Sequence, residues 1–173
     1  MRISIIGGPA SGKSWLAQKI SKKFNIPHIQ IDRFWFEAGG LHENESLPEA
    51  ERNRIREYIK TRTFEFIEKD SWVSDGFYSR SVGPEIAKRA DVIIFLNIPL
   101  WRRLINHAKR VLKPSTRHLE LGLWHELTFF PEIVRRTYAN GPKMRSFVKE
   151  YENKVITLTS RKEINEYLQK LTT

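Results

Sequence analysis

Short apolar runs alternate with longer segments in which apolar residues recur every three or four positions, and this alternation extends along the whole chain. The short runs are rich in β-branched residues, which is typical of strands, whereas the longer spacing is typical of amphipathic helices. Strands are predicted at 3–6, 28–31, 72–74, 92–98 and 155–158. Because strands that alternate with helices form parallel sheets, we predict an α/β fold in which helices cover both faces of five parallel strands, giving three layers.

Two segments near the start of the chain can be assigned in more detail. The first helix is predicted from residue 12 or 13 to Phe24, with Leu16 and Ile20 on its apolar face. Segment 33–40 follows the second strand. Because this segment is aromatic and ends in two glycines, it is predicted to be a loop.

Later helices are placed by their caps, prolines and apolar spacing. A serine followed three positions later by glutamate predicts helix starts at Ser46 and Ser160. Pro131 is predicted to separate two helical pieces, 123–130 and 132–139. The helix after Pro99 is predicted to bury its apolar residues, Trp101, Leu104, Ile105, Ala108 and Leu112.

The composition narrows the class of protein. A chain of 173 residues fits one domain, and no apolar run approaches the ~18 residues of a membrane span. We predict a cytoplasmic protein without disulfides or thiolate metal sites, because cysteine is absent and the opening residues lack the pattern of a secretory signal. The 30 Lys and Arg outnumber the 20 Asp and Glu, giving a formal charge of +10. This excess favours anionic partners, and the phosphates of nucleotides and of nucleic acids fit it equally well.

The stretch Gly7-Gly8-Pro9-Ala10-Ser11-Gly12-Lys13-Ser14 satisfies the phosphate-binding pattern G-x-x-x-x-G-K-[ST]. It lies between the first predicted strand and the first predicted helix, where the mechanism requires it. Glycine lets successive N–H groups turn around a phosphate, and the helix N-terminus adds positive potential there. We therefore predict that residues 7–14 bind the phosphates of ATP, with Lys13 on the β- and γ-phosphates and Ser14 on Mg²⁺.

Two carboxylates follow predicted strands, at the edge of a parallel sheet where ligands bind. Asp75 is predicted to hold Mg²⁺ directly or through water, although an Asp before Gly76 also fits a plain turn. Asp32 either orients or deprotonates an acceptor hydroxyl, or forms an Asx turn or an ion pair with Arg33. Asp91 precedes its strand, so it is predicted to lie at the opposite edge and to be structural.

Phosphoryl transfer also needs positive charge around the transferred group. Four arginines lie on or after the helix that follows Pro99, namely Arg102, Arg103, Arg110 and Arg117. Arg110 is the preferred lid residue because it lies near the end of that helix. The alternative is that each of these arginines only solvates an exposed helix face.

Several stretches are similar to one family, the adenylate-kinase-related proteins called DNA topology modulation proteins: residues 7–14, 28–32 with 34–35, 71–78, 89–96 and 155–161. Asp75-Gly76-Phe77 also resembles the Asp-Gly-Phe-Pro-Arg stretch of adenylate kinases, which lines their nucleotide site. Tyr78 here replaces the proline, and the next arginine is Arg80. Lid helices of these kinases carry arginines on two successive turns, and if Arg110 matches the second, Asn106 occupies the first. The resemblance implies a P-loop NTPase fold of the nucleotide-kinase type.

These observations predict an ATP-binding phosphotransferase that moves the γ-phosphoryl of ATP·Mg²⁺ to a small acceptor such as a nucleoside, a nucleotide or a similar metabolite. The expected catalytic residues are Lys13, Asp32, Asp75 and Arg110. The chain is expected to form a single kinase-like domain in which one insertion binds the acceptor and another forms the lid, at about 33–66 and 111–143.

Two other hypotheses stay open. One is an ATP-dependent regulator or ATPase acting on DNA, which the charge and the family name favour, although no nucleic-acid-binding motif supports it. The other is a nucleotide-binding protein without catalysis, which Asn106 in the lid helix permits. The oligomeric state is not predicted.

Overall fold

Five parallel strands form a single sheet at the centre of the molecule. The computed structural model describes residues 1–39, 47–78, 82–112 and 123–171. The strands are β1 (Arg2–Gly7), β2 (His28–Gln30), β3 (Trp72–Asp75), β4 (Val92–Leu96) and β5 (Val155–Leu158). They lie in the order β2-β3-β1-β4-β5, and each neighbouring pair is parallel. The predicted five-stranded parallel α/β sheet is confirmed.

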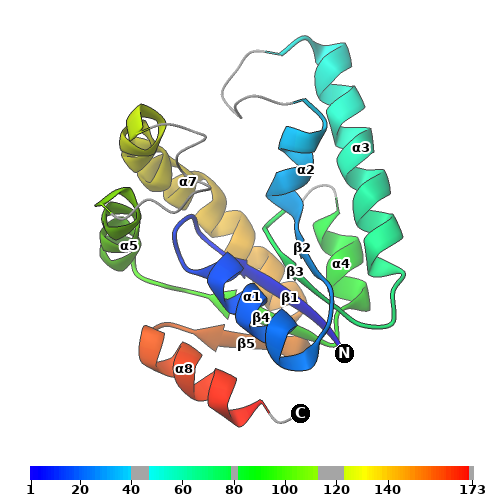
Figure 1. Cartoon of the computed structure of the whole chain (residues 1–173), viewed down its shortest axis with the longest axis vertical. Helices are drawn as coiled ribbons and strands as arrows, with labels where there is room; N and C mark the ends of the chain where they lie inside the picture. Colours follow the sequence, from blue (N-terminus) through cyan, green and yellow to red (C-terminus); the bar gives the residue numbers. More distant parts are fainter. Residues whose placement is uncertain (40–46, 79–81, 113–122, 172–173) are drawn as a thin grey trace.

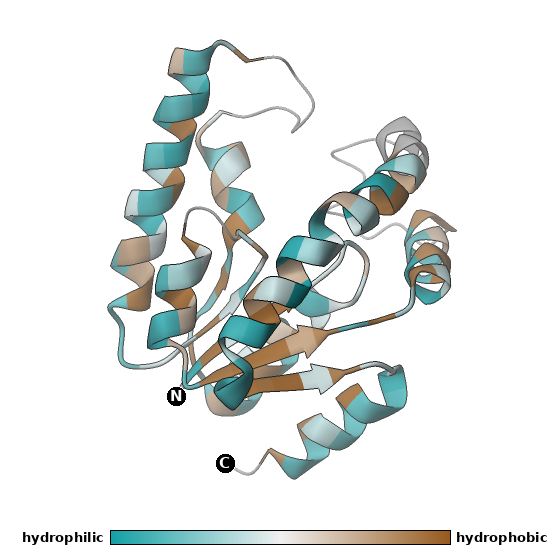
Figure 2. Ribbon diagram, turned by 180° about the vertical axis from the view of Figure 1, so that it is seen from behind, coloured by the Kyte–Doolittle hydropathy of each residue, from teal (hydrophilic) through white to brown (hydrophobic). Residues whose placement is uncertain are grey.

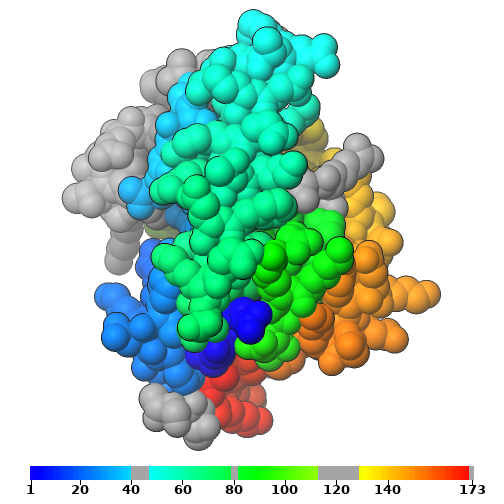
Figure 3. Space-filling view, turned by 90° about the vertical axis from the view of Figure 1, so that its right-hand side faces the viewer, coloured from blue at the N-terminus to red at the C-terminus, as the bar shows by residue number. Residues whose placement is uncertain are grey.

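Helices cover both faces of this sheet (Figures 1 and 2). They are α1 (Lys13–Phe24), α2 (Ile31–Glu37), α3 (Glu49–Ile67), α4 (Gly83–Arg89), α5 (Leu100–Leu112), α7 (Leu123–Glu150) and α8 (Arg161–Lys170), with a short 3-10 turn at Glu152–Lys154. Helices α1 and α8 pack on one face, whereas α3, α4 and the C-terminal part of α7 pack on the other. In Figure 3, α3 covers much of the side that faces the viewer.

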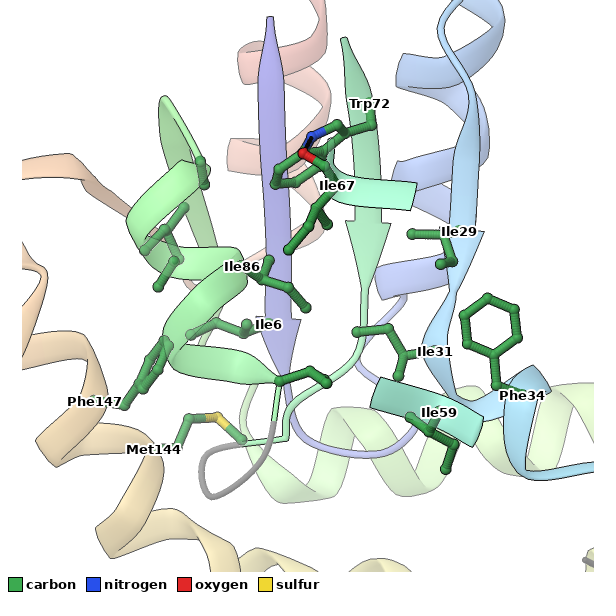
Figure 4. Packing of buried hydrophobic residues seen from close by; sticks show 14 of the residues in the cluster. Ile6, Ile29, Ile31, Phe34, Ile59, Ile67, Trp72, Ile86, Met144 and Phe147 are labelled. Atoms are coloured by element: carbon green, nitrogen blue, oxygen red, sulfur yellow. Dashed lines mark hydrogen bonds between the residues drawn. The ribbon is translucent and has the colours of Figure 1, made fainter. Parts of the chain in front are cut away.

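Alternate residues of the central strands enter two separate apolar cores. In β1, Ile5 packs with α1 and α8, whereas Ile6 packs with α4 and α7. In β4, Ile94 and Ile93 divide in the same way. Figure 4 shows the second of these cores, where Trp72 is fully buried and its indole N–H donates to the carbonyl of Ile67 at 3.2 Å. This two-sided burial explains why the central strands are continuous apolar runs rather than alternating ones.

The segment after β2 is a helix as far as Glu37, so the predicted loop at 33–40 is wrong for residues 33–37. Helix α2 spans Ile31–Glu37 and buries Ile31 and Phe34. The Phe34 ring meets that of Tyr58 edge-on, with the centroids 6.3 Å apart. Burial of these apolar side chains against α3 outweighs the modest helix propensity of aromatic residues. Asp32 consequently lies in the first turn of α2.

Helix α7 runs without a break through Pro131 and Pro142, so the predicted division at Pro131 is wrong. A proline inside a helix removes one backbone hydrogen bond. In α7 this loss is offset by apolar residues on either side of Pro142, where Ile133, Met144 and Phe147 are buried. Tertiary packing therefore overrides the local signal.

Helix α5 buries the opposite face from the one that its apolar spacing predicts. Arg103 and His107 are its buried residues, whereas Trp101 is 57% exposed and Ile105 and Leu112 are also exposed.

The start of α3 also differs from expectation, because its N-cap is Pro48, which makes no side-chain cap, while Ser46 lies outside the described residues. Within the described ranges, no helix is both long enough and apolar enough to cross a membrane.

The predicted cap of α8 is confirmed. Ser160 Oγ accepts from the backbone N–H of Glu163 at 3.2 Å, and the Glu163 carboxylate accepts from the N–H of Thr159 at 2.8 Å. We expect Ser160→Ala to lower the free energy of unfolding by about 1 kcal/mol, because it leaves an N-terminal N–H of the helix unpaired. Urea unfolding measures this change. Ser160→Asp keeps a capping oxygen and should retain most of the stability, so an equal loss in both variants would contradict the prediction.

Candidate active site

The predicted phosphate-binding loop, called the phosphate loop below, leaves the central strand of the sheet. Strand β1 ends at Gly7, and α1 begins at Lys13, so residues 8–12 make the turn at the carboxyl edge between β3 and β4. The turn needs left-handed backbone at two positions, Gly12 with φ of 94° and Ala10 with φ of 57°. Glycine adopts this conformation without strain, which explains the second glycine of the pattern. The loop therefore presents its N–H groups and the N-terminus of α1 at one place.

Lys13 folds back over this loop. Its ammonium donates to the carbonyl of Gly8 at 3.0 Å. Burial lowers the pKa of Lys13, and the charges of Arg103 and Arg136 lower it further, while Asp32 and Asp75 act in the opposite direction. The net shift is downward, so the protein holds this cation in a place that disfavours its charge. A bound anion would relieve that cost.

A cleft of about 320 Å³ opens above the loop. Its walls come from the phosphate loop, from α2 and from the facing sides of α5 and α7. Figure 1 shows α2 and α3 on one side of the loop and α5 and α7 on the other. Four of the predicted site residues line it, namely Lys13, Ser14, Asp32 and Arg110. Of the other predicted loop residues, Gly7, Gly8, Pro9 and Ala10 also line it.

Arg103 lies against the loop from the side of α5. Its side chain is buried, its Nε donates to the carbonyl of Ile98 at 3.1 Å, and its Nη2 donates to Thr137 Oγ1 at 2.8 Å. A Cβ added to Gly8 would collide with Nη1, which is buried and has no hydrogen-bond partner among the described residues. The lack of a side chain at Gly8 thus makes room for the Arg103 guanidinium. Burial lowers the pKa of Arg103.

Three further arginines line the cleft, namely Arg110, Arg136 and Arg145. Arg110 donates from Nη2 to His107 Nδ1 at 2.8 Å, and His107 is buried against the ring of Phe130. Arg136, on α7, donates from Nε to Glu132 at 2.6 Å and lines the cleft. Burial lowers the pKa of Arg136, and the charge of Asp32 partly counters this, so α2 and α7 interact electrostatically across the cleft. Arg136 carries no motif that would identify it from the sequence.

Asp32 is held by a tyrosine. Its Oδ1 accepts from the hydroxyl of Tyr78 at 2.6 Å. Burial and the neighbouring Asp32 charge raise the pKa of Tyr78 well above its usual 10.0, so Tyr78 stays a donor. Arg33 pairs with Glu37 rather than with Asp32, so the alternative ion pair is wrong. Tyr78, which stands where adenylate kinases have a proline, therefore contacts Asp32, the residue predicted to meet the acceptor hydroxyl.

Asp75 does not line the cleft but lies just behind it. Its carboxyl is 1% exposed, and Oδ2 lies 3.0 Å from His28 Nε2. Oδ1 is buried and has no hydrogen-bond partner among the described residues. An unpaired buried oxygen together with the hydroxyl of Ser14 suits Mg²⁺, which binds oxygen ligands and keeps several waters. No cluster of three or more His, Cys, Asp or Glu occurs in the described ranges, so a metal here would depend on nucleotide phosphates as well.

A second, wider groove of about 800 Å³ lies on the other side of the loop, between α5 and α8. Its walls include Trp15, Trp101, Ile105 and Arg161. The Arg161 guanidinium stacks over the Trp15 ring at 3.5 Å from the centroid. Because residues 10 and 13–14 of the phosphate loop line both cavities, a molecule bound to the loop could extend into each.

The other arginines named from the sequence lie away from the cleft or outside the description. Arg102 is exposed over the Trp101 ring. Arg80 and Arg117 lie outside the described residues. At the opposite edge of the sheet, Asp91 accepts from the Arg2 N–H at 2.7 Å, as its structural assignment predicts.

The sequence matches no protein-family model and no curated protein. Among solved structures, shikimate kinase from Bacteroides thetaiotaomicron is similar, with 20% identity, a TM-score of 0.58, and 98% of this chain and 94% of that chain covered. Shikimate kinase from Aquifex aeolicus vf5 is similar with 18% identity, a TM-score of 0.53, and 98% and 92% covered. At these identities the likeness concerns the fold.

The chain has the fold of a P-loop kinase. This confirms the predicted fold class, in which strand, phosphate loop and helix follow one another at the centre of a parallel sheet. The resemblance to DNA topology modulation proteins is not confirmed by these comparisons and stays a prediction.

The lowered pKa of Lys13 links stability to pH. Between that lowered value and the usual 10.5, the unfolded chain binds more protons than the folded chain, so stability rises with pH in this window. We expect Lys13→Met to be more stable than the parent at neutral pH, because it removes a buried charge, and the difference should shrink as the pH approaches 10.5. Urea unfolding at both pH values measures this. Lys19→Met, on the exposed side of the same helix, is the control, and an equal gain there would contradict the prediction.

Proposed function

We propose that the protein is an ATP-dependent phosphotransferase that transfers the γ-phosphoryl group to a hydroxyl of a small anionic acceptor. The observation that carries the proposal is the meeting of the partly buried Lys13 ammonium and the Asp32 carboxylate in a cleft that four arginines line. Lys13 and the arginines suit a polyphosphate, and Asp32 suits a hydroxyl. A cleft that only bound nucleotide would have no need of the carboxylate.

The two cavities suggest how ATP would lie. The triphosphate would occupy the loop, with Lys13 on the β- and γ-phosphates and Arg103 and Arg110 on oxygens that gain charge during transfer. The base would extend into the groove beside Trp15 and Arg161, where an aromatic ring can stack. Mg²⁺, held by Ser14 and by Asp75 directly or through water, would neutralise phosphate charge.

Asp32 and Arg136 would bind different groups of the acceptor. Asp32 Oδ1 already accepts from Tyr78, so its second oxygen is the one that would accept the proton of the attacking hydroxyl. Arg136 faces Asp32 from α7 and would hold a carboxylate or phosphate of the acceptor. Glu132 keeps Arg136 in place, because its buried carboxylate accepts from both Arg136 and Arg135.

The nucleotide half of the proposal is tested with Lys13→Ala. We expect the affinity for ATP·Mg²⁺, measured by isothermal titration, to fall at least about 10-fold, because one charge-assisted contact to phosphate is lost. Lys19→Ala, on the same helix and exposed, should bind like the parent. Equal affinity of Lys13→Ala and the parent would show that the phosphate-site assignment is wrong.

The acceptor half is tested by incubating ATP·Mg²⁺ with nucleosides, nucleotides and hydroxyl acids and following ADP. We expect turnover with an acceptor that carries both a hydroxyl and an anionic group. Asp32→Asn should lower kcat for that acceptor by at least about 100-fold, as loss of a general base does. ADP formation that no acceptor increases would contradict the transfer reaction and favour nucleotide binding without catalysis.

Arg136 and its neighbour Arg135 allow a controlled test of which residue binds the charged group of the acceptor. Their side chains are 22% and 62% exposed, and both pair with Glu132. We expect Arg136→Gln to raise the KM for the acceptor about 10-fold or more, because it removes a charge-assisted contact, while leaving the KM for ATP within about 3-fold. Arg135→Gln should change neither constant. Equal effects of the two substitutions on the KM for the acceptor would show that Arg136 does not bind the acceptor.

A further inference from the structure

Strand β2 carries two polar side chains that point to the same side of the sheet. Side chains alternate along a strand, so His28 and Gln30 share a face, while Ile29 between them enters the apolar core on the α3 side. His28 and Gln30 therefore face α1. Gln30 lies opposite Asp75 in the parallel register of β2 and β3.

Each of the two side chains reaches one of the proposed Mg²⁺ ligands. His28 Nε2 lies 3.0 Å from Asp75 Oδ2, and Gln30 Nε2 donates to Ser14 Oγ at 3.2 Å. An ionised carboxylate can only accept, so the His28 contact requires the proton on Nε2. One three-residue strand thus contacts both ligands, although they come from β3 and α1.

These contacts leave a free acceptor position on both ligands. Asp75 Oδ2 is occupied by His28, while the buried Oδ1 has no hydrogen-bond partner among the described residues. A serine oxygen has two lone pairs, and Gln30 takes one of them. Outer partners of this kind fix the orientation of a metal ligand and raise its basicity.

We propose that His28 and Gln30 are positioning residues for the magnesium site, His28 by orienting Asp75 and Gln30 by orienting Ser14. The inference rests on the proposed function, since it takes Ser14 and Asp75 as the ligands. Neither residue touches the metal. They act by holding the two oxygens in place before nucleotide and metal arrive, so their loss should weaken metal binding and leave metal-free nucleotide binding intact.

The test removes the two donors separately. His28→Leu and Gln30→Met each delete one hydrogen bond, His28→Gln retains a donor, and Gln18→Met makes the same chemical change at an exposed position of α1. Electron paramagnetic resonance of free Mn²⁺ measures metal affinity in the presence of the β,γ-methylene analogue of ATP. Isothermal titration of the same analogue with EDTA measures nucleotide affinity without metal.

We expect His28→Leu and Gln30→Met to lose about 10-fold or more in Mn²⁺ affinity, while binding the analogue without metal within about 2-fold of the parent. His28→Gln should recover most of the affinity, and Gln18→Met should equal the parent. Unchanged Mn²⁺ affinity in both donor-deleted variants would overturn the inference. An equal loss with and without metal would also overturn it, because the residues would then be structural. If His28→Leu does not fold, the Mn²⁺ affinity of Gln30→Met alone tests the inference.

Ser14→Ala and Asp75→Asn separate this inference from the proposed function. If both lose Mn²⁺ affinity while the His28 and Gln30 variants keep it, only the positioning role is overturned. If Ser14→Ala and Asp75→Asn bind Mn²⁺ like the parent, the metal ligands of the proposed function are wrong, and the positioning role is overturned with them.

Discussion

The placement of the Lys13 ammonium in a partly buried position is the constraint on which the site depends. A cation taken out of water is costly unless opposite charge or hydrogen bonds replace its hydration. Here burial lowers the pKa of Lys13, Arg103 and Arg136, and only the carboxylates Asp32 and Asp75 act against it. Such an excess of cations in a partly closed cleft is most easily balanced by a ligand with several negative charges. The charge of the site therefore favours a polyphosphate over a neutral ligand.

Sheet order explains how these charges come together. Strand β1 lies in the middle of the sheet, so the loop that follows Gly7 has β3 on one side and β4 on the other. Parallel strands end at one edge, which places Asp75 at the end of β3 and Asp32 just past β2 beside the loop. The arginines come from the helices that continue from the β4 side. The sheet thus supplies acidic residues from one half and basic residues from the other.

Local patterns predicted the parts of the structure that local physics determines. The phosphate loop, the five strands and the Ser160 cap depend on residues adjacent in sequence, and the structure confirms them as structural elements. The helix at Ile31–Glu37 and the unbroken α7 depend on packing against distant segments, which propensity and proline signals do not include. Arg136, His28 and Gln30 were missed for the same reason. Their partners are 104, 47 and 16 positions away, namely Asp32, Asp75 and Ser14, although the polar alternation of β2 was visible in the sequence.

The apolar periodicity of α5 predicted the wrong buried face, and the contacts of the helix explain why. The spacing of Trp101 and Ile105 identified an apolar stripe, and an apolar stripe normally faces a core. In this helix the inward face carries Arg103 and His107, whose side chains reach Thr137 and the Phe130 ring on α7. The stripe lies instead along the groove that also contains Trp15 and Arg161. Exposed aromatic surface beside a phosphate loop is costly in water but useful to a ligand that has a flat ring at one end and phosphates at the other. Helix α5 therefore suits the proposed nucleotide on both faces, with cations toward the place proposed for the phosphates and apolar surface toward the place proposed for the base.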